Sequence, residues 1–224
     1  MKQKVILLDI NETVLSLQSL RTSFAATFGH EHLTDTWFAM VLHASTVSVV
    51  TGVKTNFANL AKISLETLAA RLRVNLSEQT IADILQVFAS LKPHSDIVPA
   101  LLKLRAAGFQ IVALSNSSLG LITKQIQNSG LSDYFEDLIS VEEAATFKPS
   151  REAYQLASHR LGRQACDLRL VACHDWDTHG AICAGLHAAY IDRAGAVYNP
   201  LYKKPKIYAS TMHDVADLII SSDA

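Results

Sequence analysis

The sequence predicts an α/β protein with a doubly wound, Rossmann-like parallel sheet and an inserted helical domain. From Pro93 onward, short apolar runs alternate with helical segments, several of which end at a glycine such as Gly108 or Gly162. This alternation is typical of β-α-β units with right-handed crossovers. Before Pro93, about seventy residues keep helical spacing of apolar side chains. The sheet is therefore expected to be interrupted once, directly after its first strand.

The first strand is expected at the apolar run 5–8, which leads into the carboxylate of Asp9. A continuous apolar run suits a strand that is buried on both faces, as in a parallel sheet. Open α/β sheets bind their ligands at the carboxyl ends of their strands, which makes Asp9 a candidate site residue. Alternatively, Asp9 caps the next helix.

The insertion is expected to hold four amphipathic helices that pack as a small four-helix bundle. Thr34 or Asp35 is expected to cap the second helix and Ser77 the fourth, because hydroxyl and carboxylate side chains accept bonds from free N–H groups there. The domain boundaries that follow are a core of residues 1–15 and 92–224 and a helical cap of residues 16–91.

The core is expected to contain regular structure as far as residue 191. The expected elements are a helix near 99–107, a strand at 109–114, a helix to 128, a strand at 138–140, a helix at 151–161, a strand at 168–173, a helix after Asp177 and a strand at 188–191. The stretch 199–206 is rich in Pro, Tyr and Lys and is expected to lie at the surface.

Composition argues against several classes of partner. The formal net charge is −1 and no block of Lys or Arg stands out, so we expect binding to neither nucleic acid nor an anionic membrane. No apolar run approaches the ~20 residues of a membrane-spanning helix, and the first residues do not resemble a signal peptide. The three cysteines form no CxxC motif, so reduced thiols in a cytoplasmic protein are expected.

Polar side chains follow several of the expected strands. Asp9, the pair Ser115–Asn116, Lys148 and the stretch 174–179 (His-Asp-Trp-Asp-Thr-His) all come shortly after a strand. The carboxyl ends of parallel strands lie along one edge of the sheet, so these groups should converge although they are far apart in sequence. Their convergence predicts an active site at that edge.

This arrangement resembles the haloacid dehalogenase superfamily and, within it, the type II 2-haloacid dehalogenases. The resemblance covers essentially the whole chain, and the inserted helices correspond to the family's cap domain. It implies a hydrolase that acts on short 2-haloalkanoic acids without a cofactor. The motifs that carry it are Asp9-Ile10-Asn11-Glu12-Thr13, Leu114-Ser115-Asn116, Phe147-Lys148-Pro149 with Tyr154, and Asp175-Trp176-Asp177-Thr178-His179-Gly180-Ala181.

The resemblance implies that Asp9 is a nucleophile that displaces halide and forms an ester. Lys148 would keep Asp9 ionised by placing a positive charge beside it. An activated water must then hydrolyse the ester, and Asp177 is expected to help. We expect Glu12 to orient His179 as the general base for that water. The alternatives are a surface lysine at Lys148, a loop carboxylate at Glu12 and a first-turn helical residue at His179.

Several side chains are expected to bind the substrate. Thr13, Ser115 and Asn116 offer donors for the nucleophile and for a carboxylate, although Ser115–Asn116 could equally cap a helix. Type II dehalogenases usually carry a cap arginine where this chain has Phe38, so the carboxylate needs another donor, which His174 could supply. The remaining candidates for substrate contact are Asn11, Tyr154 and Trp176.

Three other functions compete with the dehalogenase. A magnesium-dependent phosphatase of the same superfamily needs an acid where this chain has Asn11 and another where it has Cys173. A transition-metal site could form from His174 and His179, but their spacing of five differs from the usual i, i+4. The third is a catalytically silent binding protein. The expected partner is a small molecule, and a homodimer is possible. The apolar cap residues Trp37, Phe38 and Met40 are expected to be exposed, where they could line the substrate pocket or form a dimer contact.

Overall fold

Strand β1 (Val5–Leu8) lies inside a six-stranded parallel sheet in the computed structural model, which describes residues 4–223. All four of its residues are buried. The strand order is β5-β4-β1-β6-β7-β8, and each neighbouring pair is parallel. The predicted doubly wound α/β fold with a helical insertion is confirmed.

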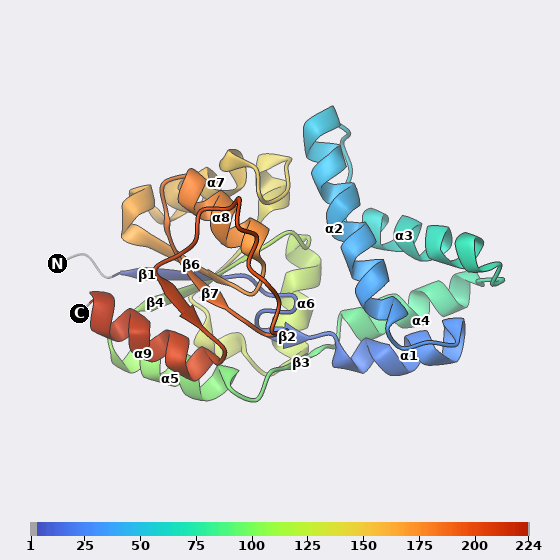
Figure 1. Ribbon diagram of the computed structural model, residues 1–224, viewed down its shortest axis with the longest axis horizontal. Coiled ribbons are helices and arrows are strands. Elements are labelled where there is room, and N and C mark those ends of the chain that lie inside the picture. The colour runs from blue at the N-terminus through green and yellow to red at the C-terminus, as the bar shows by residue number, and fades with distance from the viewer. Residues whose placement is uncertain (1–3, 224) are drawn as a thin grey trace.

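The elements follow one another along the chain as shown in Figure 1. The strands after β1 are β2 (Leu15–Ser16), β3 (Lys92–Pro93), β4 (Gln110–Ser115), β5 (Asp137–Ser140), β6 (Leu168–Ala172), β7 (His187–Ile191) and β8 (Ile207–Ala209). The helices are α1 (Gln18–Phe28), α2 (Leu33–Thr51), α3 (Phe57–Leu72), α4 (Glu78–Phe88), α5 (Ile97–Ala106), α6 (Leu119–Asn128), α7 (Arg151–Leu161), α8 (Asp175–Cys183) and α9 (Met212–Asp223).

Helices cover both faces of the sheet. Figure 1 shows α5 and α9 together on one side and α7 and α8 on the other. The chain first moves from β1 to β4 and β5 at one edge, and then crosses to β6, β7 and β8 at the other. The strand order therefore reverses at β1, and a ligand site is expected where such a reversal occurs, beyond the carboxyl ends of the strands.

The register places three strand ends side by side. Leu8 of β1 pairs with Ala113 of β4 and with Val171 of β6. The backbone N–H of Asp9 donates to the carbonyl oxygen of Val171 at 3.1 Å, which continues the ladder past β1. Residues that follow β1, β4 and β6 therefore emerge at the same edge.

The cap consists of α1–α4 and lies beside the carboxyl edge of the sheet (Figure 1). The chain enters and leaves it through the antiparallel pair of β2 and β3, in which Leu15 pairs with Pro93 and Ser16 with Lys92. The predicted boundaries after residues 15 and 91 fall beside this pair, and the division into two domains at those positions stays a prediction.

An aromatic cluster fills the interior of the cap. Trp37 is fully buried, packs 5.4 Å from Phe24 and edge-on at 5.5 Å from Phe88, and donates its indole N–H to the carbonyl of Ala61 at 3.0 Å. Phe38 is also buried, with 3% exposure. The expectation that Trp37 and Phe38 are exposed is therefore wrong, because their rings pack inside the protein. A homodimer stays a prediction.

Two local predictions about element boundaries were wrong. Helix α2 begins at Leu33, so Thr34 and Asp35 lie inside its first turn and do not cap it. Regular structure also continues beyond residue 191, in β8 and α9. In α9, Val215, Ala216 and Ile219 are buried at helical spacing, a signal that the sequence contained. The predicted cap of α4 is confirmed, since the Ser77 hydroxyl accepts from the N–H of Thr80 at 3.0 Å.

Two further expectations concern membranes and cysteines. Within residues 4–223, no helix combines the length and hydropathy that crossing a bilayer demands. All three cysteines are free thiols.

Gly180 of α8 provides a test of the packing beneath the site. A Cβ atom at this position would lie 2.6 Å from the Cβ of Pro149 and 2.6 Å from the hydroxyl of Tyr154. We expect Gly180→Ala to lower the free energy of unfolding by about 1–3 kcal/mol, because overpacking outweighs the helix preference of alanine of about 1 kcal/mol. Urea unfolding measures the change.

The matched control is Gly120→Ala in α6, where an added Cβ meets open space. It should leave stability unchanged or raise it. Equal stabilisation by both substitutions would contradict the close packing of α8.

Candidate active site

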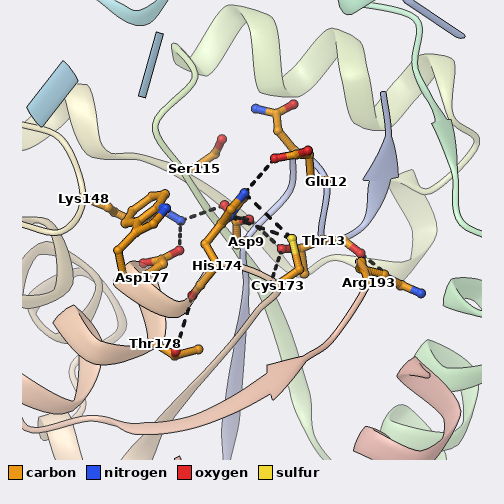
Figure 2. Close-up of polar contacts among 12 residues, drawn as sticks. Asp9, Glu12, Thr13, Ser115, Lys148, Cys173, His174, Asp177, Thr178 and Arg193 are labelled. Atoms are coloured by element: carbon orange, nitrogen blue, oxygen red, sulfur yellow. Dashed lines mark hydrogen bonds and ion pairs between the residues drawn. The ribbon is translucent and has the colours of Figure 1, made fainter. Parts of the chain in front are cut away.

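A buried lysine lies between two carboxylates at the edge where the strands end (Figure 2). The Nζ of Lys148 donates to Oδ1 of Asp9 at 2.8 Å and to Oδ2 of Asp177 at 2.6 Å. The side chains of Lys148, Asp9 and Asp177 are 1%, 8% and 0% exposed, respectively. The structure therefore brings together three residues that are far apart in sequence, in the loop after β1, the segment before α7 and the first turn of α8, and Lys148 is not a surface lysine.

This triad keeps Asp9 ionised. Burial by itself would raise the pKa of Asp9, but the charge of Lys148 and the contact with His174 lower that pKa far below its usual value. Burial would lower the pKa of Lys148, but Asp177 and Asp9 raise it. Burial and the nearby Asp9 carboxylate raise the pKa of Asp177, while Lys148 opposes them. Asp9 is consequently a desolvated anion at neutral pH.

Neighbouring loops hold the triad in place. The side-chain oxygen of Asn116, after β4, accepts from the backbone N–H of Lys148 at 2.8 Å. The hydroxyl of Tyr154, on α7, donates to Oδ1 of Asp177 at 2.7 Å. Burial and Asp177 hold the pKa of Tyr154 well above its usual value, so the hydroxyl remains a donor. Asn116 and Tyr154 therefore support the triad.

Thr13 contacts the candidate nucleophile directly, whereas Ser115 shapes a neighbouring loop. The hydroxyl of Thr13 donates to Oδ2 of Asp9 at 2.6 Å and accepts from the backbone N–H of Cys173 at 2.9 Å. This ties the loop after β1 to the end of β6. The hydroxyl of Ser115 accepts from the N–H of Ser117 at 3.1 Å and so shapes the loop after β4.

His174 lies between two carboxylates. Its Nε2 is 2.8 Å from Oε2 of Glu12, and its Nδ1 is 3.3 Å from Oδ2 of Asp9 (Figure 2). A neutral imidazole carries one N–H, whereas the imidazolium carries one on each nitrogen. A carboxylate on both sides therefore favours the protonated ring. Burial lowers the pKa of His174, but Cys173 and the bonds to Asp9 and Glu12 raise it well above its usual value.

The prediction that Glu12 pairs with His179 is wrong. The ring of His179 stacks on Tyr202 at 4.6 Å, and its Nδ1 accepts from the backbone N–H of Lys203 at 3.0 Å. Helix α8 begins at Asp175 instead of after Asp177, so His179 lies on its second turn. His174 precedes α8 with an extended backbone, so the two histidines do not share one helix face. Glu12 meets His174 instead.

Asn11 does not face the candidate nucleophile. Its amide nitrogen donates to the hydroxyl of Ser117 at 3.1 Å, and its amide oxygen accepts from Nε2 of Gln125 at 3.0 Å. Both partners belong to the core beyond β4. The expectation that Asn11 binds substrate is therefore not supported, because both ends of its amide are already bonded.

Aromatic rings form the wall beside His174. Trp176 stacks on the His174 ring at 5.1 Å, and Phe38 of α2 lies 6.4 Å from it. A cavity of about 290 Å³ adjoins this wall between α2 and the core, lined by Leu42, Thr46, Lys148 and Trp176 among others. The structure thus brings the predicted Phe38 and Trp176 to the site.

A magnesium ion, which the phosphatase alternative requires, fits these residues poorly. Asn11, in place of the second acid, is bonded away from Asp9. The Nζ of Lys148 is bonded to both buried carboxylates. Cys173, in place of another acid, offers a thiol, and Mg²⁺ prefers oxygen ligands. Among the described residues, no three His, Cys, Asp or Glu side chains are grouped as metal ligands, His174 and His179 included.

The sequence analysis missed two residues that hold the loop after β1. Nε2 of His94 lies 2.9 Å from the carbonyl oxygen of Glu12, and Nη2 of Arg193 donates to the carbonyl of Thr13 at 3.1 Å. Arg193 also pairs with Asp96 at 2.7 Å. Contacts of a side chain with a distant backbone leave no pattern in the sequence, so no signal in the sequence indicates a role for His94 or Arg193.

Comparison with known proteins shows which families and enzymes this chain is similar to. The family model of the haloacid dehalogenase-like hydrolases matches residues 3–168. A curated (S)-2-haloacid dehalogenase of Pseudomonas fluorescens is 26% identical over 195 residues, which cover 87% of this chain and 86% of that protein. The (S)-2-haloacid dehalogenase of Xanthobacter autotrophicus is 27% identical over 192 residues, or 85% of this chain and 75% of that protein.

Solved structures show the same fold. The L-2-haloacid dehalogenase RSc1362 superposes with a TM-score of 0.93 at 23% identity, covering 98% of this chain and 99% of its own. The L-2-haloacid dehalogenase from Xanthobacter autotrophicus superposes with a TM-score of 0.90 at 22% identity, covering 99% of this chain and 100% of its own. A HAD phosphatase from Thermococcus onnurineus superposes with a TM-score of 0.65 at 17% identity, covering 97% of this chain and 98% of its own.

The ion triad predicts a large loss of stability on removal of its cation. Lys148→Met should lower the free energy of unfolding by about 3–5 kcal/mol at neutral pH, because it leaves buried carboxylates unpaired. The folded-state pKa of Asp9 is lowered, so its contribution is present above the ordinary carboxyl pKa of about 4 and is lost as pH falls. The difference from wild type should therefore shrink below about pH 4.

Urea unfolding at several pH values measures this difference. The control is Lys62→Met, which removes the exposed ion pairs of Lys62 with Glu66 and Glu78 and should change the stability far less. Equal losses for both variants, independent of pH, would contradict the account of the triad.

Proposed function

Because this chain belongs to the haloacid dehalogenase-like hydrolases, we propose that it hydrolyses the carbon–halogen bond of short 2-haloalkanoic acids. One observation carries the proposal: Asp9 is buried and held ionised by Lys148 at the strand end where the sheet order reverses. Its relatives that are named (S)-2-haloacid dehalogenases support the choice of substrate.

In the first step, a carboxylate oxygen of Asp9 attacks the substrate carbon that carries the halogen. A bond forms between that oxygen and the carbon, and the carbon–halogen electron pair leaves with the halide. A carboxylate is a weak nucleophile in water, so its activation depends on desolvation and orientation. Burial of Asp9 supplies the first, and the bonds from Lys148 and Thr13 supply the second.

His174 takes over the role of the missing cap arginine. The Phe38 ring stands where an arginine would supply a positive charge, and it lies 6.4 Å from the His174 ring. An imidazolium at this position provides a charge for the substrate carboxylate, while Phe38 and Trp176 provide an apolar wall. Asn116 adds a donor, because only its amide oxygen is bonded within the described part of the chain.

In the second step, Glu12 and His174 activate the water that hydrolyses the Asp9 ester. Neutral His174 takes a proton from water as the hydroxide adds to the ester carbonyl carbon. When the intermediate collapses, the 2-hydroxy acid leaves with the proton from His174. The Asp9 carboxylic acid then returns its own proton to His174. One water is consumed, and one halide and one proton are released overall.

Ester formation itself prepares His174 for this second role. The free enzyme holds the ring between two anions, Asp9 and Glu12. Esterification neutralises Asp9 and so removes one of the charges that raise the pKa of His174. The imidazolium then releases its proton more readily, and Glu12, which is one-third exposed, connects it to solvent. A cation that attracts the substrate thus becomes a base.

A phosphatase is the less favoured alternative. It requires an acid two residues after the nucleophile to protonate the leaving group, and Asn11 at that position is bonded to Ser117 and Gln125. An amide cannot supply that proton.

Halide release from the purified protein tests the reaction. We expect chloride release from short 2-chloroalkanoic acids without added metal, and Asp9→Asn should abolish it because an amide cannot form the ester. Release of phosphate from p-nitrophenyl phosphate with magnesium, without halide release, would contradict the proposal. If neither assay detects a product and Asp9→Asn binds ligand as well as wild type does, a binding protein would be favoured.

Trapping the ester tests the water-activating pair. We expect His174→Gln and Glu12→Gln to slow hydrolysis by about 100-fold or more, the usual contribution of a general base, so that alkylated Asp9 accumulates. Mass spectrometry of the peptide that contains Asp9 measures it. His179→Gln is the matched control, because its ring contacts Tyr202 and Lys203, and it should turn over normally. Ester accumulation in the His179 variant alone would overturn the assignment to His174.

A further inference from the structure

Glu12 has a backbone conformation that side chains rarely adopt. Its φ angle is +64°, in the left-handed region. For a residue other than glycine this conformation is sterically strained, because Cβ comes too close to the following carbonyl oxygen. The other described non-glycine residues with positive φ, Arg73 and Ala145, end helical segments, where such a conformation is common. Glu12 ends no helix, so its neighbours must hold it.

His94, which directly follows β3, restrains the backbone of Glu12. The Glu12 N–H donates to the carbonyl of Leu15 at 2.8 Å, which fixes one side of the peptide. On the other side, Nε2 of His94 lies 2.9 Å from the Glu12 carbonyl oxygen. His94 follows β3 directly, and its backbone N–H donates to the carbonyl of Val14 at 3.0 Å. A single residue therefore fixes the loop at two carbonyls.

The charge state of His94 suits this contact. Burial lowers the pKa of His94, and repulsion by Arg193 lowers it further, although Glu12 and Asp96 oppose the shift. His94 is therefore neutral at pH 7 and carries one N–H. A carbonyl oxygen only accepts, so that N–H is at Nε2.

The orientation of the Glu12 side chain depends on this backbone. Its carboxylate is 33% exposed, and within the described residues its one hydrogen-bonded partner is His174, at 2.8 Å (Figure 2). A carboxylate so exposed is not confined by packing and would be well solvated elsewhere. Relaxation of φ to a negative value would turn the side chain away from His174.

We propose that His94 is a positioning residue, which holds Glu12 in its left-handed conformation and so aims its carboxylate at His174. The catalytic consequence rests on the proposed function, whereas the geometric part does not. His94 contacts no reacting group and acts only through Glu12.

The test compares two substitutions that differ in one hydrogen bond. His94→Gln places an amide N–H close to the position of Nε2, whereas His94→Leu removes the donor. His94→Asn, whose amide is too short to reach, replaces the leucine variant if that one does not fold. The control is Asn128→Leu. This substitution removes a hydrogen bond to the carbonyl of Ala89 at 2.9 Å, shortly before β3, and affects no contact of the loop at Glu12.

The first measurement needs no substrate. NMR titration of the imidazole C–H of His174, assigned with His174→Gln, reports on the groups that face this ring, namely Asp9, Glu12 and Cys173. We expect His94→Leu to lower the pKa of His174 by about one unit, because Glu12 withdraws. His94→Gln and Asn128→Leu should keep the wild-type value. An unchanged pKa in a folded His94→Leu variant would overturn the proposal.

The second measurement follows the reaction. With a 2-chloroalkanoic acid, His94→Leu should slow hydrolysis of the Asp9 ester by about 10- to 100-fold while ester formation changes much less, and His94→Gln should restore hydrolysis. A purely structural role would instead lower stability and leave the ratio of the two rates unchanged. If wild type releases no halide, the proposed function fails, and the titration still decides the positioning role.

Discussion

The ion triad of Asp9, Lys148 and Asp177 is the interaction on which the site depends. Three buried charges are tolerable only together, because each carboxylate alone would take up a proton and the lysine alone would lose one. The triad joins the loop after β1 to the segment before α7 and to the first turn of α8. The same pairing that lets these groups be buried leaves Asp9 ionised and poorly solvated, which is the state a nucleophile needs.

Beside this triad, the chain departs from the arginine that type II dehalogenases usually carry. Phe38 is expected at that place, and we propose that the imidazole of His174, which lies between Asp9 and Glu12, supplies the positive charge instead. An arginine keeps its charge throughout a reaction, whereas a histidine changes its charge when a neighbour does. In the proposed reaction, His174 would therefore couple substrate binding to water activation in one side chain, which an arginine could not do.

Much of the fold followed from periodicity. The apolar run before Asp9 and the alternation after Pro93 predicted a doubly wound sheet, and polar groups after its strands predicted where the site lies. The partner of Glu12 could not be predicted in the same way. Helix α8 starts three residues earlier than expected, which leaves His174 as the residue before its first turn, and helix boundaries are the least predictable feature of a sequence. The contacts of His94 and Gln125 link distant segments and leave no local pattern at all.

The most direct measurement is a single turnover in water labelled with heavy oxygen, with enzyme in excess over a 2-chloroalkanoic acid. If Asp9 forms an ester that water hydrolyses at the carbonyl carbon, the label enters the Asp9 carboxylate and the 2-hydroxy acid carries none of it. Peptide mass spectrometry reads the label in the Asp9 peptide. Label in the product, with an unlabelled Asp9, would show that water attacks the substrate directly and would contradict the account.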